Sequence, residues 1–128
     1  MKLLLDTVTF LDAVMRPEDL SPRVRDLLLD PENERYLSIA SSWEIAIKFS
    51  LGKLTLPADP GQFIPEHREK LAADVLPIDE ESVLHMTRLP VLHRDPFDRI
   101  LISQALIHAM IFVTPDVRIA KYPIRVAW

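Results

Sequence analysis

Short apolar runs alternate with segments of helical periodicity along the whole chain, and this order constrains the fold more than any other feature. The runs that we expect to be strands cover residues 2–5, 34–39, 75–78, 110–114 and 125–128. Helical segments separate all of them, so the strands need crossover connections. The sequence therefore predicts an α/β fold, a parallel sheet of about five strands with helices on both faces.

Capping residues mark where several of the helices begin. Ser21 precedes Pro22, Asp79 precedes an acidic turn, and Asp95 precedes Pro96, which are combinations typical of helix starts. We expect helices around residues 10–14 and at 22–29, 41–51, 62–73, 80–88 and 96–109. Gly52 ends the third of them. In that helix Trp43, Ile47 and Leu51 form one apolar stripe, which predicts a face packed against the core.

Composition limits the class of protein. The chain has 128 residues, of which 48% are hydrophobic and 27% charged, as expected for one globular domain spanning residues 1–128. A formal charge of −4 provides no general attraction to nucleic acid, so RNA would have to meet a local basic rim. Cysteine is absent, no apolar run is long enough for a membrane span, and Asp6 comes too early for a signal peptide. We expect a cytoplasmic protein without membrane contact.

The stretch His93-Arg94-Asp95-Pro96-Phe97-Asp98-Arg99 carries the most unusual chemistry. If Asp95 is the N-cap, Asp98 lies in the first helical turn. Helical spacing then puts Asp98 on the same face as Leu101, Ile102 and Ala105. An ionised carboxylate on an inward face is costly unless another group compensates it. Asp98 is therefore a candidate functional residue.

Four carboxylates are predicted at one edge of the sheet. Asp6 and Asp116 follow buried strands, and Glu44 and Asp98 lie in early turns of helices that can face the same edge. Oxygen donors without His or Cys are typical of a Mg²⁺ site, with Mn²⁺ as a possible substitute. Without a cation their mutual repulsion would be expensive. The pattern thus indicates a metal site that binds phosphate oxygens and activates water.

Each acidic residue also has a purely structural interpretation. Ser41-x-x-Glu44 matches a capping box, in which Glu44 would only bond to its own helix start. Asp95 is best explained as a cap, and Asp116 could be a turn residue. Asp98 could simply favour the positive end of the helix dipole. Asp6 is the hardest to explain structurally, because it ends a buried strand.

Basic residues next to these acids are candidates for contacts with substrate. Arg94 and Arg99 flank Asp98 and could hold a phosphate, or could instead form salt bridges with Asp95 or Asp98. Lys48 lies four residues after Glu44 and can pair with it. The histidines show no spacing typical of metal ligands, and we expect them on the surface or in loops; they are His67, His85, His93 and His108.

At these same residues the chain resembles PIN-domain proteins of the VapC toxin type. The similarity lies in Leu3-Leu4-Leu5-Asp6-Thr7, in Ser41-x-Trp43-Glu44-Ile45-Ala46-Ile47-Lys48, in Leu51-Gly52-Lys53-Leu54, in the His93–Arg99 string, and in Val113-Thr114-x-Asp116. The resemblance implies a parallel sheet flanked by helices and a ribonuclease that uses Mg²⁺ or Mn²⁺. By position, it implies that Asp6, Glu44 and Asp98 are core metal ligands and that Asp116 is a fourth, more variable one. Thr114 would orient a neighbouring carboxylate or contact substrate.

The resemblance also implies partners, namely a small antitoxin that covers the active site and a second copy in a homodimer. Val8 and Pro115 depart from the residues common in close relatives, which affects substrate contacts and leaves the metal ligands in place. The leading hypothesis is a Mg²⁺-dependent endoribonuclease of a type II toxin–antitoxin pair, in which a metal-bound water attacks the RNA phosphodiester.

Two other functions compete with this hypothesis. A receiver-like phosphoacceptor domain is also an α/β protein with an acidic pocket, but residues 38–40, Ser-Ile-Ala, end the second expected strand without a carboxylate. A PIN fold without activity that only binds a partner is the other alternative. The complete set of acidic residues argues against that alternative.

Overall fold

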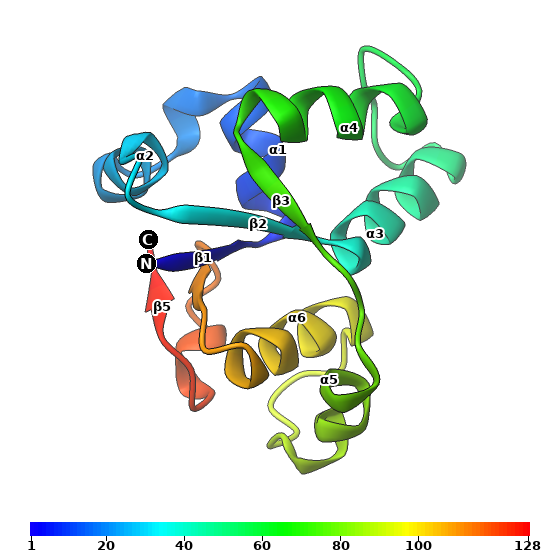
Figure 1. Cartoon of the computed structure of the whole chain (residues 1–128). Helices are drawn as coiled ribbons and strands as arrows, with labels where there is room; N and C mark the ends of the chain where they lie inside the picture. The colour runs from blue at the N-terminus through cyan, green and yellow to red at the C-terminus, as the bar shows by residue number, and fades with distance from the viewer.

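The sheet has the predicted parallel arrangement. The structure is a computed structural model that describes residues 1–128. Its strands lie in the order β3-β2-β1-β4-β5, and each neighbouring pair is parallel (Figure 1). They are β1 (Lys2–Leu5), β2 (Glu34–Ser38), β3 (Ala73–Leu76), β4 (Ile111–Val113) and β5 (Val126–Ala127).

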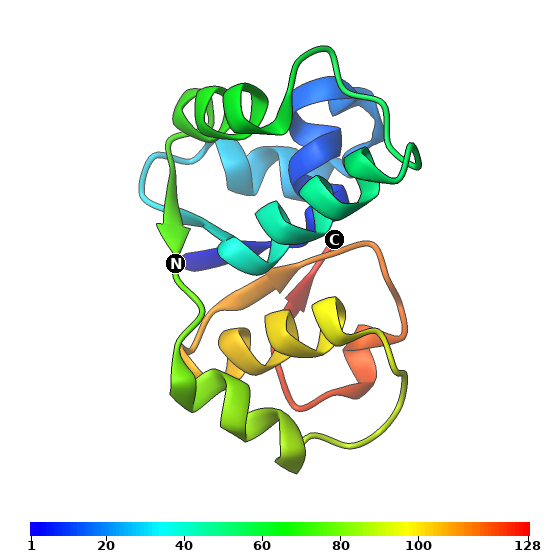
Figure 2. The ribbon, with the colours of Figure 1, turned by 90° about the vertical axis from the view of Figure 1, so that its right-hand side faces the viewer.

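Helices cover both faces, as the alternation of elements requires. Four lie on one side of the sheet: α1 (Thr7–Met15), α2 (Pro22–Leu29), α3 (Ile39–Ser50) and α4 (Pro60–Lys70) (Figures 1 and 2). On the other side α6 (Pro96–Ile107) packs against the sheet and α5 (Glu80–His85) packs against α6. Three short 3₁₀ helices complete the chain: η1 (Pro17–Asp19), η2 (Met86–Arg88) and η3 (Ile119–Lys121).

The central strand β1 separates two hydrophobic cores. Leu3 and Leu5 point into the core beneath α1 to α4, whereas Leu4 points into the core beneath α6. All three side chains are completely buried, which fits the unbroken apolar run. Alternation along a single strand thus fixes both layers of the domain.

Helix α3 begins earlier than the sequence suggests. Its first residue is Ile39, and Ser38 is the N-cap, whose hydroxyl oxygen accepts a hydrogen bond from the Ala40 amide (3.0 Å). The same hydroxyl donates to Gln104 of α6 (2.6 Å). Ser41 therefore lies inside the helix, and the capping box that was the structural alternative for Glu44 does not form. The other predicted caps, Ser21, Asp79 and Asp95, are confirmed.

The predicted inward stripe of α3 is wrong. Trp43 and Leu51 are 57% and 63% exposed, and Ile47 is also exposed. The face of α3 that packs inward carries Ala40, Ser41, Glu44 and Ile45 instead. Helix α3 has two apolar faces. Because β2 runs directly into α3, the direction of the strand determines which of these faces packs against the sheet.

Smaller differences concern the ends of elements. Helix α4 spans residues 60–70 instead of 62–73, and β3 spans residues 73–76 instead of 75–78. None of the helices has both the length and the apolar composition that a membrane span needs.

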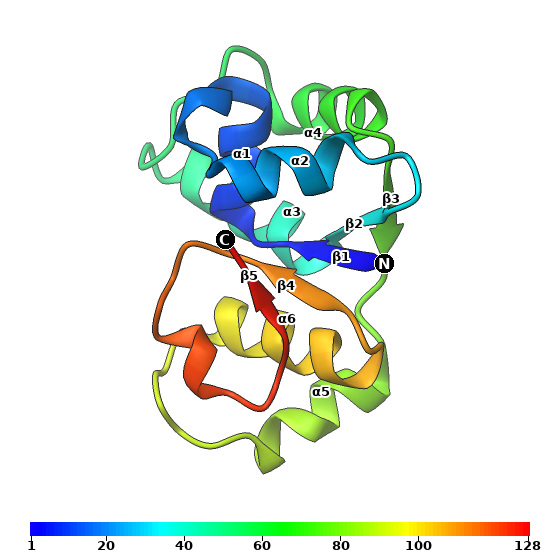
Figure 3. The same cartoon turned by 90° about the vertical axis from the view of Figure 1, so that its left-hand side faces the viewer.

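The carboxyl edge of the sheet contains a change in strand order. The chain builds outward from β1 through β2 to β3, then returns to the other side of β1 with β4 and β5. Ligand sites of open α/β sheets form at such a reversal, outside the carboxyl ends of the strands. Figure 3 shows that the C-terminus lies at this same edge, where β5 ends. Asp6 and the segment after β4 therefore meet beside the reversal.

Candidate metal and active site

A cleft of about 420 Å³ opens at the carboxyl edge and brings the predicted carboxylates together. Asp6, Glu44, Asp98 and Asp116 all line it, and so does Asp95. They come from the end of β1, from α3, from the first turn of α6 and from the turn after β4. The predicted juxtaposition is present; the role of these residues as metal ligands stays a prediction.

Asp6 is held by two hydrogen bonds at the end of β1. Its Oδ1 accepts from the Thr7 amide (2.7 Å) and caps α1, and its Oδ2 accepts from the Thr114 hydroxyl (2.6 Å). Burial raises the pKa of the Asp6 carboxyl, and these two hydrogen bonds offset part of that rise. Thr114 itself is buried, so it orients Asp6 as expected and cannot also contact substrate.

Glu44 is buried in α3 and both of its carboxylate oxygens have partners. Its Oε1 accepts from the Thr7 hydroxyl (2.7 Å), and its Oε2 pairs with Lys48 Nζ (2.5 Å). The predicted Glu44–Lys48 pair is thus confirmed. The hydrogen bond to Glu44 raises the pKa of Lys48, which therefore remains a cation at the cleft.

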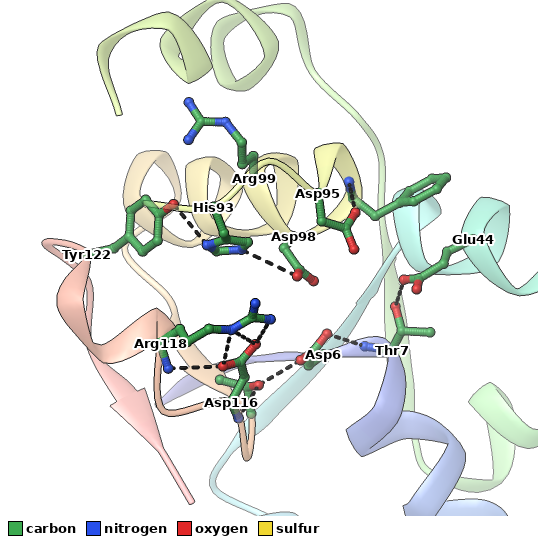
Figure 4. A network of polar contacts seen from close by, with 12 residues as sticks. Asp6, Thr7, Glu44, His93, Asp95, Asp98, Arg99, Asp116, Arg118 and Tyr122 are labelled. Carbon is green, nitrogen blue, oxygen red and sulfur yellow. Dashed lines mark hydrogen bonds and ion pairs between the residues drawn. The ribbon is translucent and has the colours of Figure 1, made fainter. Parts of the chain in front are cut away.

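Asp98 is the least compensated carboxylate of the cleft. Its side chain is 16% exposed, and the only side chain paired with it is His93, with Nε2 3.4 Å from Oδ2 (Figure 4). Burial, followed by the charges of Asp95, Asp6, Glu44 and Asp116, raises the pKa of Asp98 to about 7. The predicted inward orientation of Asp98 on α6 is therefore confirmed. Burial and the neighbouring carboxylates both disfavour its ionised form.

Asp116 lies at the far side of the cleft and is neutralised locally. Its amide donates to the Thr114 hydroxyl (3.1 Å), so one threonine orients both Asp6 and Asp116. The Arg118 guanidinium, 2.7 Å from Asp116 Oδ2, lowers the pKa of Asp116. Figure 4 shows this guanidinium turned toward the acidic cluster.

The arginines of the His93–Arg99 string do not line the cleft. Arg99 points away from it (Figure 4) and donates to the carbonyls of Pro90 and Met86 (both 3.0 Å). The structure therefore assigns Arg99 to anchoring the loop before α6 and not to binding phosphate. Arg94 is exposed, and its contact with substrate stays a prediction.

Sequence reasoning missed three contributors to the site. Lys53 lines the cleft, as does Lys48. In the sequence, the only feature that pointed to Lys53 was its place in the Leu51–Leu54 motif. Arg118 reaches Asp116 from two residues further along. The ring of His93, expected at the surface or in a loop, lies in a loop but is almost fully enclosed.

A second hollow, of about 440 Å³, lies between α5, η2 and the end of α6. It contains a single carboxylate, Glu81, together with His85 and Arg88. The acidic cleft is the better candidate site because several charged groups from separate elements converge only there.

The donor set of the cleft fits a hard divalent cation. Every candidate ligand is a carboxylate oxygen, and the lining holds five carboxylates against two lysines. Burial first, and neighbouring carboxylates second, raise the pKa of Asp98. In this arrangement no three acidic or histidine side chains are close enough to share one cation. The carboxylates surround the cleft, and coordination would need their side chains to rotate inward.

Comparisons with known proteins identify the family and the fold. Residues 3–124 match the model of the PIN domain family. Ribonuclease VapC16 of Mycobacterium tuberculosis (strain ATCC 25618 / H37Rv) is 33% identical over 67 residues, which is 52% of this chain and about half (48%) of the relative's length.

Among solved structures, VapBC2 from Rickettsia felis bound to a promoter DNA fragment has a chain with a TM-score of 0.75 and 13% identity, covering 100% of this chain and 99% of that one. A chain of a toxin–antitoxin complex from Klebsiella pneumoniae has a TM-score of 0.62 at 16% identity, covering 98% of this chain and 96% of that one. At such identities these similarities establish the fold.

Proposed function

The chain belongs to the PIN domain family, and on this basis we propose that it is a metal-dependent endoribonuclease, the toxin of a type II toxin–antitoxin pair. One observation carries the proposal: carboxylates from four separate elements converge at the reversal of strand order, in a cleft with excess negative charge. The similarity to Ribonuclease VapC16 supports RNA as the substrate.

Asp6, Glu44 and Asp98 would hold Mg²⁺, or Mn²⁺ in its place, with Asp116 as a further ligand. When bound, the cation supplies an activated water and neutralises charge on phosphate oxygens. The chain's own residues prepare this site. Thr7 bonds to Glu44 and Thr114 bonds to Asp6, which keeps these two buried carboxylates at the cleft, from where rotation of the side chains would bring them onto the cation.

An acidic protein needs local cations to accept an RNA backbone. Lys48 and Lys53 line the cleft on the α3 side, and Arg118 lies across from them beside Asp116. We assign the phosphate contacts to these residues, with exposed Arg94 as a further contributor. The basic groups thus flank the carboxylates on two sides, as a strand of RNA crossing the cleft would require.

We also propose two protein partners. The solved complexes VapBC2 and the Klebsiella pneumoniae toxin–antitoxin pair support an antitoxin partner. A second copy of this chain is supported by an apolar groove of about 220 Å³ between α3, α5 and α6, lined by Trp43, Val83 and Phe97 among others. Trp43 and Val83 are exposed there, which is typical of an association surface.

Sedimentation can test the second copy. Trp43→Asp should convert the protein to a monomer, whereas Leu29→Asp, at a still more exposed apolar position on α2, should leave its mass unchanged. A monomeric wild type at all concentrations would contradict the homodimer.

The nuclease itself is tested by cleavage of total cellular RNA by purified protein in Mg²⁺, with Asp6→Asn in parallel. Discrete fragments from the wild type, lost with chelator and with Asp6→Asn, are expected. Equal products from both proteins would indicate contamination and remove the role of Asp6. A folded wild type that cuts no RNA would favour the alternative of a PIN fold that only binds its partner.

A further inference from the structure

The ring of His93 is enclosed between Asp98 and Tyr122. Its side chain is only 8% exposed, Nε2 lies 3.4 Å from Asp98 Oδ2, and Nδ1 lies 3.1 Å from the Tyr122 hydroxyl (Figure 4). Nε2 has no hydrogen-bond partner within normal distance, although it is fully buried. A buried ring nitrogen without a partner is uncommon, and this one faces a carboxylate of the cleft.

The contacts define which nitrogen carries the proton. Nε2 faces an oxygen of Asp98, which only accepts hydrogen bonds when the carboxylate is ionised, as a bound cation would require, so the favourable form then has the proton on Nε2. Nδ1 can then accept from the Tyr122 hydroxyl. Tyr122 is 3% exposed and its ring packs edge-on to His93, with 5.4 Å between the ring centroids, so the ring of His93 is held on both sides.

The backbone that carries His93 is fixed independently. Arg99 bonds to the carbonyls of Met86 and Pro90, at the start of the loop that leads to His93. Tyr122 ends η3, which follows the strand that leads to Asp116. The ring of His93 therefore lies between Asp98, in the first turn of α6, and Tyr122, in the segment that follows Asp116.

We propose that His93, held by Tyr122, is a positioning residue that fixes the Asp98 carboxylate for the cation. This inference rests on the proposed metal-dependent nuclease. A hydrogen bond from Nε2 to Oδ2, which shortening of the 3.4 Å separation would complete, would restrain rotation of the Asp98 carboxylate and leave Oδ1 for the cation. Partners that orient ligands in this way typically contribute about 10–100-fold to metal affinity.

The test measures Mn²⁺ binding to the full-length protein without RNA, by titration calorimetry. Tyr122→Phe removes only the hydroxyl and should weaken binding about 10-fold. His93→Leu removes both ring nitrogens and should weaken it by about 10–100-fold, whereas His93→Gln keeps an N–H near the position of Nε2 and should recover most of the affinity. Tyr36→Phe is the matched control, because its hydroxyl bonds only to exposed Glu34.

The variants should keep the circular dichroism spectrum of the wild type, so that a change in affinity reports the site. In the wild type with Mg²⁺ bound, ¹⁵N chemical shifts of the His93 ring should show the proton on Nε2, and a proton on Nδ1 alone would overturn the proposal. Wild-type affinity in both Tyr122→Phe and His93→Leu, with binding lost in Asp98→Asn, would overturn the positioning role and leave the nuclease intact. Absence of Mn²⁺ binding by the wild type would overturn both.

Discussion

Helix α6 carries an aspartate–histidine pair at each end. At its C-terminal end His108 Nε2 lies 2.8 Å from Asp79 Oδ1, and at its N-terminal end His93 Nε2 lies 3.4 Å from Asp98 Oδ2. Burial raises the pKa of Asp79, but hydrogen bonds from His108 and Ser82 outweigh it and lower that pKa to about 2. Burial and four neighbouring carboxylates instead raise the pKa of Asp98 to about 7.

The difference lies in what surrounds each carboxylate. Asp79 caps α5, and its oxygens accept from the Ser82 amide and hydroxyl as well as from His108. Asp98 has one long contact and several like charges nearby. Asp79 and His108 therefore form a structural pair at the C-terminal end of α6. At the N-terminal end, Asp98 and His93 leave negative charge that a bound cation would offset.

The largest difference between the pairs should appear in activity. Asp98→Asn should lower RNA cleavage by about 10²–10³-fold or more, because a proposed metal ligand is lost. Asp79→Asn should cleave at the wild-type rate, since Asp79 is remote from the cleft. Measured rates on one RNA substrate in Mg²⁺ provide the comparison. An Asp98→Asn variant that retains most of its activity would remove Asp98 from the site.

The pairs should also give opposite pH dependences of stability without metal. The folded-state pKa of Asp98 lies above its usual 3.8, so the free energy of unfolding should fall as pH rises from about 4 to about 7. That of Asp79 lies below 3.8, so its contribution is present above about 4 and is lost as pH falls toward about 2.

Urea denaturation in EDTA separates these two contributions. The stability of the wild type relative to Asp98→Asn should decline between pH 4 and pH 7 by on the order of a few kcal/mol. Relative to Asp79→Asn, it should decline only in acid, below about pH 4. A difference between wild type and Asp98→Asn that does not change with pH would contradict the raised pKa of Asp98.

Asp6 sharpens the comparison, because it is more buried than Asp98 and yet hydrogen-bonded at both oxygens. Thr114→Val keeps the shape of the side chain and removes the donor to Asp6. It should lower the free energy of unfolding by about 1–3 kcal/mol, the cost of an unsatisfied buried acceptor. Thr87→Val, at an exposed position, should stay within about 0.5 kcal/mol of the wild type in the same urea experiment.

The smallest effect is expected from the structural pair itself. Asp79→Ala removes the cap of α5 and the partner of His108, which should cost about 1 kcal/mol of stability. Asp79→Asn should recover most of this loss, since asparagine also caps helices well. Thermal unfolding at neutral pH would distinguish the two variants, and equal melting temperatures for Asp79→Ala and the wild type would contradict the role of the cap.

Local patterns were sufficient to predict the layers of the fold and the four carboxylates Asp6, Glu44, Asp98 and Asp116 that line the cleft. Asp95-Pro96 defined the start of α6, and hence the orientation of Asp98, because capping and helical spacing depend on neighbours in sequence. The apolar run before Asp6 placed that carboxylate at a strand end for the same reason. These features needed no knowledge of distant contacts.

Features that depend on distant contacts were not predictable in this way. Ser38 could not be recognised as the cap of α3, because its hydroxyl also bonds to Gln104, 66 residues later. Periodicity identified the apolar stripe with Trp43 but not whether the core or another protein covers it. Arg99 had the right charge for phosphate, but its direction depends on the loop carbonyls that it contacts.

The hydrogen bond between Thr114 and Asp6 joins residues 108 positions apart. During translation, Asp6 leaves the ribosome early, while Thr114 and Asp116 are among the last of the site to be synthesised. The central strand β1 gains its second neighbour only when β4 has emerged and inserted beside it. The carboxylates that precede β4 therefore stay apart from Asp116 until β4 has inserted, and the cleft is complete only after that step.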